Sequence, residues 1–478
     1  MEQETVLHIE GTVEQVLYRN EQNGYTVLDL DANGTLITVV GELGDVEEGE
    51  QLSVDGTYVN HVRFGVQFQA QYVERKLPED AINIQRYLSS GVIKGIGSAL
   101  AKKIVTAFGS QTLEIMEKQP TRLMEIRGIS PKKCETIAQE VQKIFALRSL
   151  MLFLQQYNIR SRYAMRAYQC YGSGAKEMIL ANPYLLCGMG IELPFEKAEI
   201  LADDLKVPKN AEQRILAGTC YILEHNTHNG YTCLPLDRLQ PKVCEYLQVS
   251  ESEFLAAYQA AQKEGNLVSY QKETREFVYL PAYYEAEQYI ADRIGVLRDF
   301  SAPEDQEIYL DLIKREETEQ GIQYAELQRK AILSALSRGL LILTGGPGTG
   351  KTTTLNGMIS LFEKQGYQVM LAAPTGRAAQ RISDLTGYEA KTIHRLLEVE
   401  FDMAGATKFR HNESNPLTCD VMIVDEMSMV DVLLFESLLR ALRFSCKLIM
   451  VGDSDQLPSV GAGNVLKDLI DSGQVPVV

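Results

Sequence analysis

The feature that most constrains this chain is a glycine-rich loop between an apolar strand and a helix, at residues 340–354. The apolar run 340–344 predicts a buried strand, and Gly345-Gly346-Pro347-Gly348-Thr349-Gly350-Lys351-Thr352 fits the spacing G-x-x-x-x-G-K-[ST]. Glycines let successive backbone N–H groups point at phosphate oxygens, and the helix N-terminus adds the positive end of its dipole. Because strand, loop, Lys-Thr and helix follow in that order, the sequence predicts a nucleoside-triphosphate site rather than a structural turn.

The polar side chains of this loop have specific expected roles. Lys351 can reach the β- and γ-phosphates, and the Thr352 hydroxyl can ligate Mg²⁺. One helix and one strand upstream, the amide of Gln328 offers both a donor and an acceptor, which suits the edge of adenine. We therefore expect ATP and Mg²⁺ as cofactors, held by Gln328, Gly346, Gly348, Thr349, Gly350, Lys351, Thr352 and Thr353.

Length and residue types set the general class of the protein. With 478 residues, and about 150 residues per domain, three or four domains are expected. There is no apolar segment at the N-terminus and no run of about 18 apolar residues, so we expect a soluble cytoplasmic protein without membrane association. The eight cysteines form no C-x-x-C pair, and the group Cys220, His225, His228 and Cys233 has no standard zinc spacing. Reduced thiols are the expectation.

The net charge of −17 conceals an uneven distribution. Residues 1–80 contain four basic and sixteen acidic side chains, whereas residues 83–150 contain eleven basic and five acidic ones. The second segment is therefore basic by six charges, and it is free to meet nucleic-acid phosphates although the whole chain is acidic.

Residues 1–77 have the pattern of a small antiparallel β-barrel. Short β-rich runs are separated by turn signals such as Asn23-Gly24 and Asn33-Gly34. Barrels of the OB type often bind single strands on aromatic platforms. This segment contains several tyrosine and phenylalanine residues that could stack on bases, but it is strongly acidic. Nucleic-acid binding and a structural or protein-docking role therefore both stay open. The expected strands are 6–9, 12–18, 25–30, 36–41, 51–59 and 66–74.

Residues 78–205 are predicted to be helical and contain a repeat. Gly95-Ile96-Gly97 is followed, 33 residues later, by Gly128-Ile129-Ser130, with matching apolar positions after each. The pair resembles tandem helix-hairpin-helix motifs, in which hairpin N–H groups contact a DNA phosphate where a Cβ would otherwise sit. Lysines flank both copies and suit sequence-independent contacts. The expected DNA-binding residues here are Gly95, Gly97, Lys102 and Gly128; residues 151–205 include a possible degenerate third hairpin.

Residues 206–300 read as three helices followed by two short strands, at 267–271 and 276–280. That order predicts a winged-helix-like module, with an unspecialised helical spacer as the alternative. Residues 301–305, Ser-Ala-Pro-Glu-Asp, read as a linker.

From residue 318 the pattern is that of an ATPase. Strands at 367–373, 421–425 and 447–451 alternate with helices, which predicts a parallel, doubly wound sheet with its site at the carboxyl ends of the strands. Asp425 and Glu426 follow one such strand. Asp425 is expected to hold Mg²⁺ and Glu426 to orient or deprotonate the attacking water. Gln456, after the next strand, is expected to sense the γ-phosphate. The predicted catalytic residues are thus Lys351, Asp425, Glu426 and Gln456.

Five segments, LTGGPGTGKTTT, APTGRAA, TIHRLL, VDEMSM and GDSDQLPSVGAG, occur in an order and spacing that resemble the RecD family of superfamily-one DNA helicases. The barrel and hairpins resemble the N-terminal extension of its longer subfamily, which is related to the exodeoxyribonuclease V alpha subunit and works without RecB and RecC. The resemblance covers essentially the whole chain. It implies an ATP-driven motor that moves 5′→3′ on single-stranded DNA and meets single-strand/double-strand junctions. It also implies that Pro374, Thr375 and Arg377, with Thr392 and His394, contact that strand.

The resemblance carries two further expectations. A β-hairpin at about 398–418 corresponds to the pin that splits the duplex in the family, although a surface hairpin without function is the alternative. The family also has a second RecA-like domain, with an arginine that completes the ATP site. Those segments are absent from this sequence, whose end at Val478 reads as the start of another strand, so we expect a fragment of a longer protein.

The predicted fold class is therefore multidomain, α+β and α/β. It comprises an OB-like barrel at 1–77, a helix-hairpin-helix region at 78–205, a winged-helix-like module at 206–300 and a RecA-like domain at 318–478. The predicted function is an ATP-dependent 5′→3′ DNA helicase in repair or recombination. An ATP-regulated DNA-binding scaffold is the main alternative. A relaxase or nuclease fusion is a second one, and the six scattered histidines disfavour the histidine cluster that a relaxase needs. A protein partner for the acidic barrel is also expected.

Overall fold

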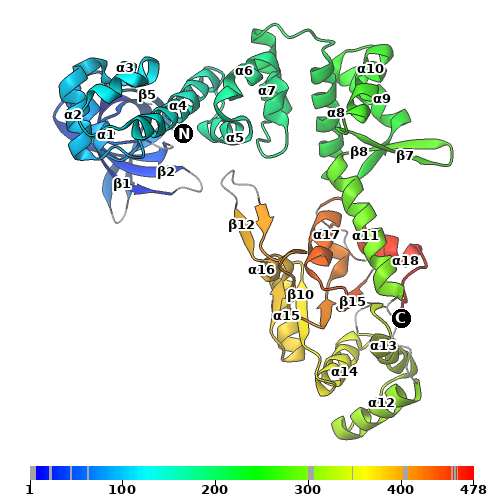
Figure 1. Cartoon of the computed structure of the whole chain (residues 1–478). Coiled ribbons are helices and arrows are strands. Elements are labelled where there is room, and N and C mark those ends of the chain that lie inside the picture. Colours follow the sequence, from blue (N-terminus) through cyan, green and yellow to red (C-terminus); the bar gives the residue numbers. More distant parts are fainter. Residues whose placement is uncertain are drawn as a thin grey trace. The chain divides into compact units, whose positions relative to one another are not determined.

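Figure 1 shows the chain as a computed structural model. The structure describes residues 7–20, 24–43, 46–61, 64–299, 306–346, 348–401, 407–453, 456, 459 and 461–478. The expected linker 301–305 and the turn residue Asn23 lie outside the described residues. The chain divides into two compact units, one up to Lys206 and one from Val207 onward. In the described part of the chain, no helix has the length and apolar character needed to cross a membrane.

The N-terminal segment forms a closed five-stranded barrel with the strand order β1-β2-β3-β5-β4. Its interior is filled by apolar side chains that alternate along the strands, among them Leu28, Leu30 and Phe68, each fully buried. The predicted turn at Asn33-Gly34 is confirmed, because both residues have positive φ, at 54° and 87°. The strands are β1 Leu7–Arg19, β2 Tyr25–Ala32, β3 Thr35–Glu42, β4 Gln51–His61 and β5 Gly65–Lys76.

The prediction of two separate strands at 6–9 and 12–18 was wrong, because β1 is continuous through Gly11. A Cβ at this position would overlap the backbone of Asp31 on β2. Gly11 is therefore required by the close approach of two strands and does not mark a turn.

Helices continue the N-terminal unit from residue 81. Helix α4 is the longest of them, and Leu150 and Leu154 near its end are fully buried. The helices are α1 Ala81–Ser89, α2 Ser98–Phe108, α3 Thr112–Lys118, α4 Pro131–Gln155, α5 Ser161–Tyr171, α6 Ala175–Ala181 and α7 Phe195–Asp204. Short 3₁₀ turns lie between them: η1 Gly109–Gln111, η2 Pro120–Glu125, η3 Gly172–Gly174 and η4 Pro183–Cys187.

The barrel and helix α4 are joined along strand β5. This strand pairs with β3 at only two positions, so part of its edge is open. Two side chains of α4 bond to carbonyl oxygens of that edge: Arg148 donates to Arg75 O at 2.8 Å, and Gln155 donates to Val73 O at 2.6 Å. The helix thus satisfies backbone acceptors that the barrel leaves free.

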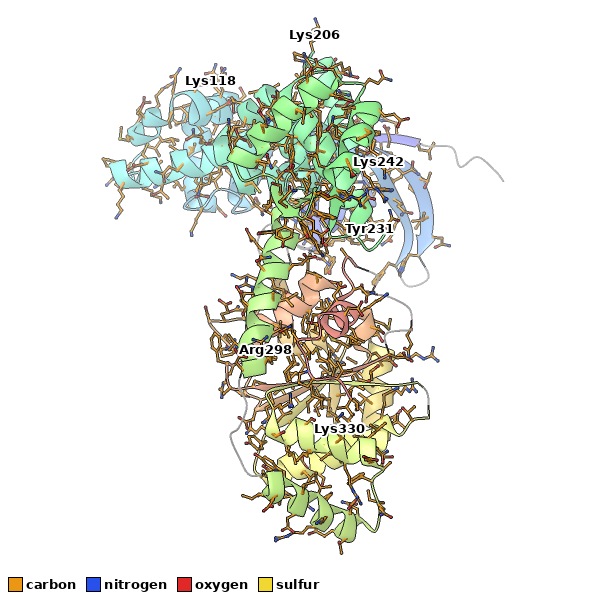
Figure 2. The ribbon with its side chains drawn as sticks, turned by 90° about the vertical axis from the view of Figure 1, so that its right-hand side faces the viewer. Lys118, Lys206, Tyr231, Lys242, Arg298 and Lys330 are labelled. Atoms are coloured by element: carbon orange, nitrogen blue, oxygen red, sulfur yellow. The ribbon has the colours of Figure 1, made fainter. Side chains whose placement is uncertain are left out.

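The second unit begins with three helices and a three-stranded antiparallel sheet in the order β6-β8-β7. This is the winged-helix-like arrangement that the sequence predicted, with one short additional strand, β6. The loop before β6 contacts the ATPase domain, because Gly463 N–H donates to Gly230 O at 3.0 Å; Tyr231 and Lys242 of this module are labelled in Figure 2. The elements are α8 Glu212–Thr227, β6 Cys233–Pro235, α9 Leu236–Leu247, α10 Glu251–Lys263, β7 Val268–Lys272 and β8 Arg275–Tyr279.

The ATPase domain is built on a five-stranded parallel sheet in the order β11-β10-β14-β15-β9. Successive residues of its central strands point to opposite faces: Met422 and Val424 enter the core under α16 and α17, and Ile423 enters the core under α13 and α14. Near the chain end, Val477 forms a parallel bridge with Ile342 of β9. The strands are β9 Leu340–Thr344, β10 Val369–Ala373, β11 Ala390–Thr392, β14 Val421–Val424 and β15 Lys447–Gly452.

Helices cover both faces of this sheet. Helix α11 Pro281–Asp299 links the winged-helix-like module to the motor, and its buried Arg293 donates to Arg443 O at 2.6 Å. A small hairpin, β12 Val399–Phe401 paired with β13 Thr407–Phe409, confirms the hairpin predicted here, although its tip lies outside the described residues. The remaining helices are α12 Gln306–Gln320, α13 Glu326–Ser337, α14 Lys351–Lys364, α15 Gly376–Thr386, α16 Ile393–Leu397, α17 Val432–Ala441 and α18 Val465–Asp471, with the 3₁₀ turn η5 Met427–Met429.

Candidate nucleotide and DNA sites

The glycine-rich loop turns the chain from strand β9 into helix α14. Gly348 and Gly350 both have positive φ, at 78° and 85°, and Gly350 is the N-cap of α14. Positive φ is costly for other residues, so these glycines allow the tight turn that presents backbone N–H groups at the helix N-terminus. Gly346 lies in the same loop, and the neighbouring Pro347 is outside the described residues.

The side chain of Lys351 lies over this loop. Its Nζ donates to Gly346 O at 3.0 Å and also to Gly345 O. The Thr349 hydroxyl donates to Gly346 O at 3.0 Å. The ammonium therefore sits at the mouth of the loop, where a phosphate oxygen would lie within its reach. Thr352 is half-buried in the first turn of α14, and Thr353 is exposed.

Gln328 lies against the loop, but its amide is already bonded within the protein. Its Oε1 accepts from Ala325 N–H at 2.9 Å, and its Nε2 donates to Gly350 O at 3.4 Å. These bonds link the start of α13 to the loop. Contact with adenine would require the Gln328 amide to give up one of these two hydrogen bonds, so this role stays a prediction.

The predicted carboxylate pair lies at the carboxyl end of β14, beside the loop. Asp425 donates its N–H to Ala372 O at 2.9 Å, and its Oδ1 accepts from Glu426 N–H at 2.9 Å. Glu426 has φ of 51°, a left-handed conformation that is unusual for a residue other than glycine. The hydrogen bond that Glu426 N–H donates to the Asp425 carboxylate holds that geometry.

Burial and charge act in opposite directions on these two acids. Burial raises the pKa of Asp425, and the charges of Arg381 and Lys351 oppose the rise. Burial also raises the pKa of Glu426, with a further contribution from the charge of Asp425. Arg381 on α15 approaches Glu426, with Nη1 at 3.5 Å from Oε1. Two acids of raised pKa beside an ammonium form a site that can bind a cation or accept a proton.

Gln456 is exposed, and its N–H donates to Asp453 O at 3.2 Å. Residues 454, 455, 457 and 458 lie outside the described part of the chain. Its expected role as a γ-phosphate sensor therefore stays a prediction.

The residues expected to contact a DNA strand follow two neighbouring strands of the sheet, β10 and β11. Thr375 and Thr392 are N-caps: Thr375 accepts from Ala378 N–H at 3.2 Å, and Thr392 accepts from Arg395 N–H at 3.2 Å. Their hydroxyls thus have a structural role at the helix starts. Arg377 and His394 are exposed beside them, and Pro374 is half-buried.

The two predicted helix-hairpin-helix turns are confirmed as turns before helices α2 and α4. Gly95 and Gly128 have φ of 99° and 109°, and a Cβ on Gly95 would lie 3.9 Å from Ile137 of the other hairpin. Gly97 is different, because its φ of −103° is ordinary and no atom lies within 4 Å of an added Cβ. The protein's own packing does not require glycine there. Lys102 is exposed on the first turns of α2.

Two more hairpins of the same kind follow, one before α5 and one before α7. In each, a residue with positive φ precedes a buried isoleucine, as in the first two: Asn158 precedes Ile159, and Gly190 precedes Ile191. The residue numbers differ by 63 between Gly95 and Asn158 and by 62 between Gly128 and Gly190. The tandem pair is therefore duplicated. The sequence suggested only one degenerate further hairpin, because Asn158 replaces glycine in one copy and the last hairpin contains extra residues.

Four family models match segments of the chain in order. They are described as "ATP-dependent DNA helicase YrrC, OB-fold domain" at residues 6–78, "SAM-like Helix-hairpin-helix tandem" at 86–143, "ATP-dependent RecD2 DNA helicase HHH domain" at 143–233 and "AAA domain" at 328–462. The third model covers the second hairpin pair.

Relatives with similar sequences are also DNA helicases or RecD subunits. The chain is 29% identical over 476 residues to the ATP-dependent RecD2 DNA helicase of Deinococcus radiodurans, covering 95% of this chain and 65% of the relative. It is 44% identical over 169 residues to the RecBCD enzyme subunit RecD of Mycolicibacterium smegmatis, about 30% of each chain. It is 31% identical over 273 residues to the RecD subunit of Haemophilus influenzae, 52% of this chain and 40% of the relative.

The chain thus spans less than two thirds of the length of these relatives. The matches nevertheless run through the barrel, the hairpins and the ATPase domain in the same order as the elements described above. In its phosphate loop, its paired carboxylates and its duplicated hairpins, the chain is similar to DNA helicases of the RecD2 and RecD type.

Proposed function

We propose that the protein is an ATP-dependent DNA helicase of repair or recombination that moves 5′→3′ on single-stranded DNA. One observation carries this proposal. The phosphate loop, the Asp425–Glu426 pair and the two segments around Arg377 and His394 all follow strands of one parallel sheet, at their carboxyl ends. Nucleotide and DNA strand would therefore share one rigid support, which favours coupling between ATP turnover and strand movement.

The roles at the nucleotide site follow from charge and position. Glycine N–H groups of the loop would hold the phosphates, and Lys351 would exchange its carbonyl contacts for phosphate oxygens. Thr352 and Asp425 are the oxygen donors that suit Mg²⁺, which neutralises phosphate charge when it is bound. Glu426 would orient the attacking water and accept its proton, because burial beside Asp425 raises the pKa of its carboxylate. Gln456 would respond to the γ-phosphate.

The N-terminal unit would hold DNA near the motor without reading its sequence. Gly97 is open to the outside, as a phosphate-contacting hairpin requires, and Lys102 adds charge beside it. We propose the domain division 1–77, 78–205, 206–300 and 318–478, with the hairpin near 398–418 as a duplex-splitting pin. A cytoplasmic location and a protein partner on the outer, acid-rich surface of the barrel are part of the same proposal.

The first test is nucleotide binding by calorimetry, with ATP and Mg²⁺. Lys351→Ala should abolish measurable binding, because a charged contact to phosphate is worth about 1.5–3 kcal/mol and anchors the loop. Lys330→Ala is the matched control, since Lys330 is an exposed lysine on the neighbouring helix α13 (Figure 2). Equal affinity of the wild-type protein and Lys351→Ala would refute the nucleotide site.

The second test separates a helicase from an ATP-regulated scaffold. The natural full-length protein is incubated with ATP and duplexes that carry either a 5′ or a 3′ single-stranded tail. Displacement of the strand from the 5′-tailed duplex alone supports directional unwinding, and Glu426→Gln should remove it. A change in DNA affinity on ATP hydrolysis, without displacement from either duplex, would favour the scaffold.

A further inference from the structure

A groove of about 840 Å³ runs between the barrel and helices α4 and α5, within the N-terminal unit. Its barrel side is formed by the start of β2, the end of β3 and strand β5. Its helical side is formed by α4 and by the third hairpin, residues 158–162. This groove is separate from the ATP site and from the expected DNA-contacting segments of the motor, which lie in the other unit.

The charges that line the groove differ from those of the rest of the barrel. Residues 1–80 hold sixteen acidic and four basic side chains, yet two of those four basic residues, Arg19 and Arg75, line this groove. Each is matched by a glutamate: Arg19 donates to Glu47 at 3.0 Å, and Arg75 donates to Glu50 at 2.7 Å. The barrel side is therefore nearly neutral where the groove lies. Over both sides of the groove, the positively charged lining residues are Arg19, Arg75, Arg148, Arg160 and Arg162, and the negatively charged ones are Glu42, Glu47 and Glu50.

The third hairpin adds positive charge that these glutamates do not neutralise. Asn158-Ile159-Arg160 occupies the position of Gly95-Ile96-Gly97 in the duplicated pair, so an arginine side chain replaces the open glycine at the N-cap of the following helix. Arg160 and Arg162 are both exposed. Within the described residues, neither of them forms an ion pair with a carboxylate, and Arg162 Nη2 donates to the Tyr163 phenol at 2.9 Å.

Two half-exposed tyrosines complete the lining. Tyr25 at the start of β2 is 39% exposed, and Tyr72 on β5 is 44% exposed. Half-exposed aromatic rings in a groove with guanidinium groups are the combination that binds single-stranded nucleic acid without sequence preference, because every base can stack on a ring. A duplex offers no free base faces, and its higher charge density would meet the acidic barrel.

We propose that this groove is a second binding site for single-stranded DNA. The phosphates contact Arg160 and Arg162, and bases stack on Tyr25 and Tyr72. The site holds a strand outside the motor, so it goes beyond the proposed helicase activity and does not depend on ATP. The duplicated hairpins then have different tasks: the first pair presents open backbone to DNA phosphates, and the third hairpin presents side chains to a strand lying along the barrel.

The absence of tryptophan from the whole sequence allows a site-specific test. Tyr72→Trp places a single fluorophore in the groove of the 478-residue chain, and Tyr58→Trp places one on the same barrel, at a residue that is 48% exposed and lies outside the groove. Titration with oligo(dT) should quench the tryptophan at 72 and leave the one at 58 unchanged. A blunt duplex should quench neither. Adding Lys351→Ala should leave the quenching intact, which separates this site from the ATP site.

A second substitution tests the phosphate contact. In the Tyr72→Trp background, Arg160→Glu should weaken oligo(dT) binding at least about tenfold, because a charged hydrogen bond is lost and a repulsive charge is added. Lys118→Glu makes the same charge change on an exposed lysine of the same unit, outside the groove, and should shift the affinity by less than about threefold. Each Kd is measured at two salt concentrations.

Three results would overturn the proposal. The first is that the emission of the tryptophan at 72 does not change at oligo(dT) concentrations at which fluorescence anisotropy shows that the chain is saturated with oligo(dT). The second is an equal effect of Arg160→Glu and Lys118→Glu on its titration. The third is quenching by poly-glutamate with no response to oligo(dT), which would identify the groove as a site for acidic peptides. Circular dichroism of each variant confirms that the fold is retained.

Discussion

A buried carboxylate, Glu50, contributes to the contact between the barrel and helix α4, and we predict that Glu50→Gln loosens the barrel. Glu50 is 1% exposed and accepts from Arg75 through both oxygens, at 2.8 Å and 2.7 Å. Arg148 of α4 lies 3.8 Å from the same carboxylate, and burial lowers the pKa of its guanidinium. The amide is isosteric, so no cavity is formed, but the change removes the charge and replaces one acceptor oxygen by an NH2 donor.

The size of the effect follows from burial. Loss of one partner of a buried ion pair costs about 3–5 kcal/mol, because the other charges stay buried without compensation. Two guanidinium groups would lose the buried charge of Glu50, although the amide oxygen can still accept one bond, so we expect about 3 kcal/mol. The exposed pair Arg86–Glu14 gives the control: it also joins a helix to the barrel, at 2.6 Å, but its side chains are 46% and 41% exposed. Glu14→Gln should cost less than about 1 kcal/mol.

Because a chain of several domains does not unfold in two states, the assay must be local. Native hydrogen–deuterium exchange of peptides from β4 measures opening of the barrel itself. A loss of about 3 kcal/mol corresponds to exchange faster by about two orders of magnitude, since each 1.4 kcal/mol is tenfold. Glu14→Gln should change the rate by less than about fivefold. Similar exchange rates in the two variants would refute the reasoning that burial gives the Glu50 network its strength.

Three further predictions concern other sites. Burial lowers the pKa of Lys447 from 10.5 to about 8, so between these pH values the folded state binds fewer protons than the unfolded state. The ATPase domain should therefore become more stable as pH rises from 8 to 10. Lys447→Met should remove this pH dependence of the melting temperature. Gly357→Ala should lower the melting temperature, at a cost of about 1–3 kcal/mol, because the added Cβ overlaps the buried Tyr324 phenol. Tyr324→Phe should restore part of the loss, since it removes the hydroxyl but leaves the ring. Gly97→Glu should weaken DNA binding equally for all sequences and flatten its salt dependence in anisotropy titrations, whereas an unchanged salt slope would make the first hairpin a structural turn only.

Much of the fold was predictable from local pattern. The alternation of turn residues and β-rich runs gave the barrel, and the order of apolar strands and helices gave the parallel sheet, because each of these signals lies within a few residues. The prediction failed at Gly11, whose glycine is needed for a contact with a strand about twenty residues away. It also failed to find the full second hairpin pair, because positive φ at Asn158 can be identified only from the backbone.

The sequence by itself determined the chemistry of the nucleotide site. Spacing alone places Lys351 and Thr352 at a helix N-terminus and Asp425 and Glu426 after a buried strand, because loop and strand ends are set by local residue order. The tertiary structure decided which distant residues meet. Arg381 approaches Glu426, and the arginines of the third hairpin line the same groove as two tyrosines of the barrel, only because separate elements pack together. Such contacts depend on packing between segments that are far apart in the chain, and a local sequence pattern does not specify which distant segments pack together.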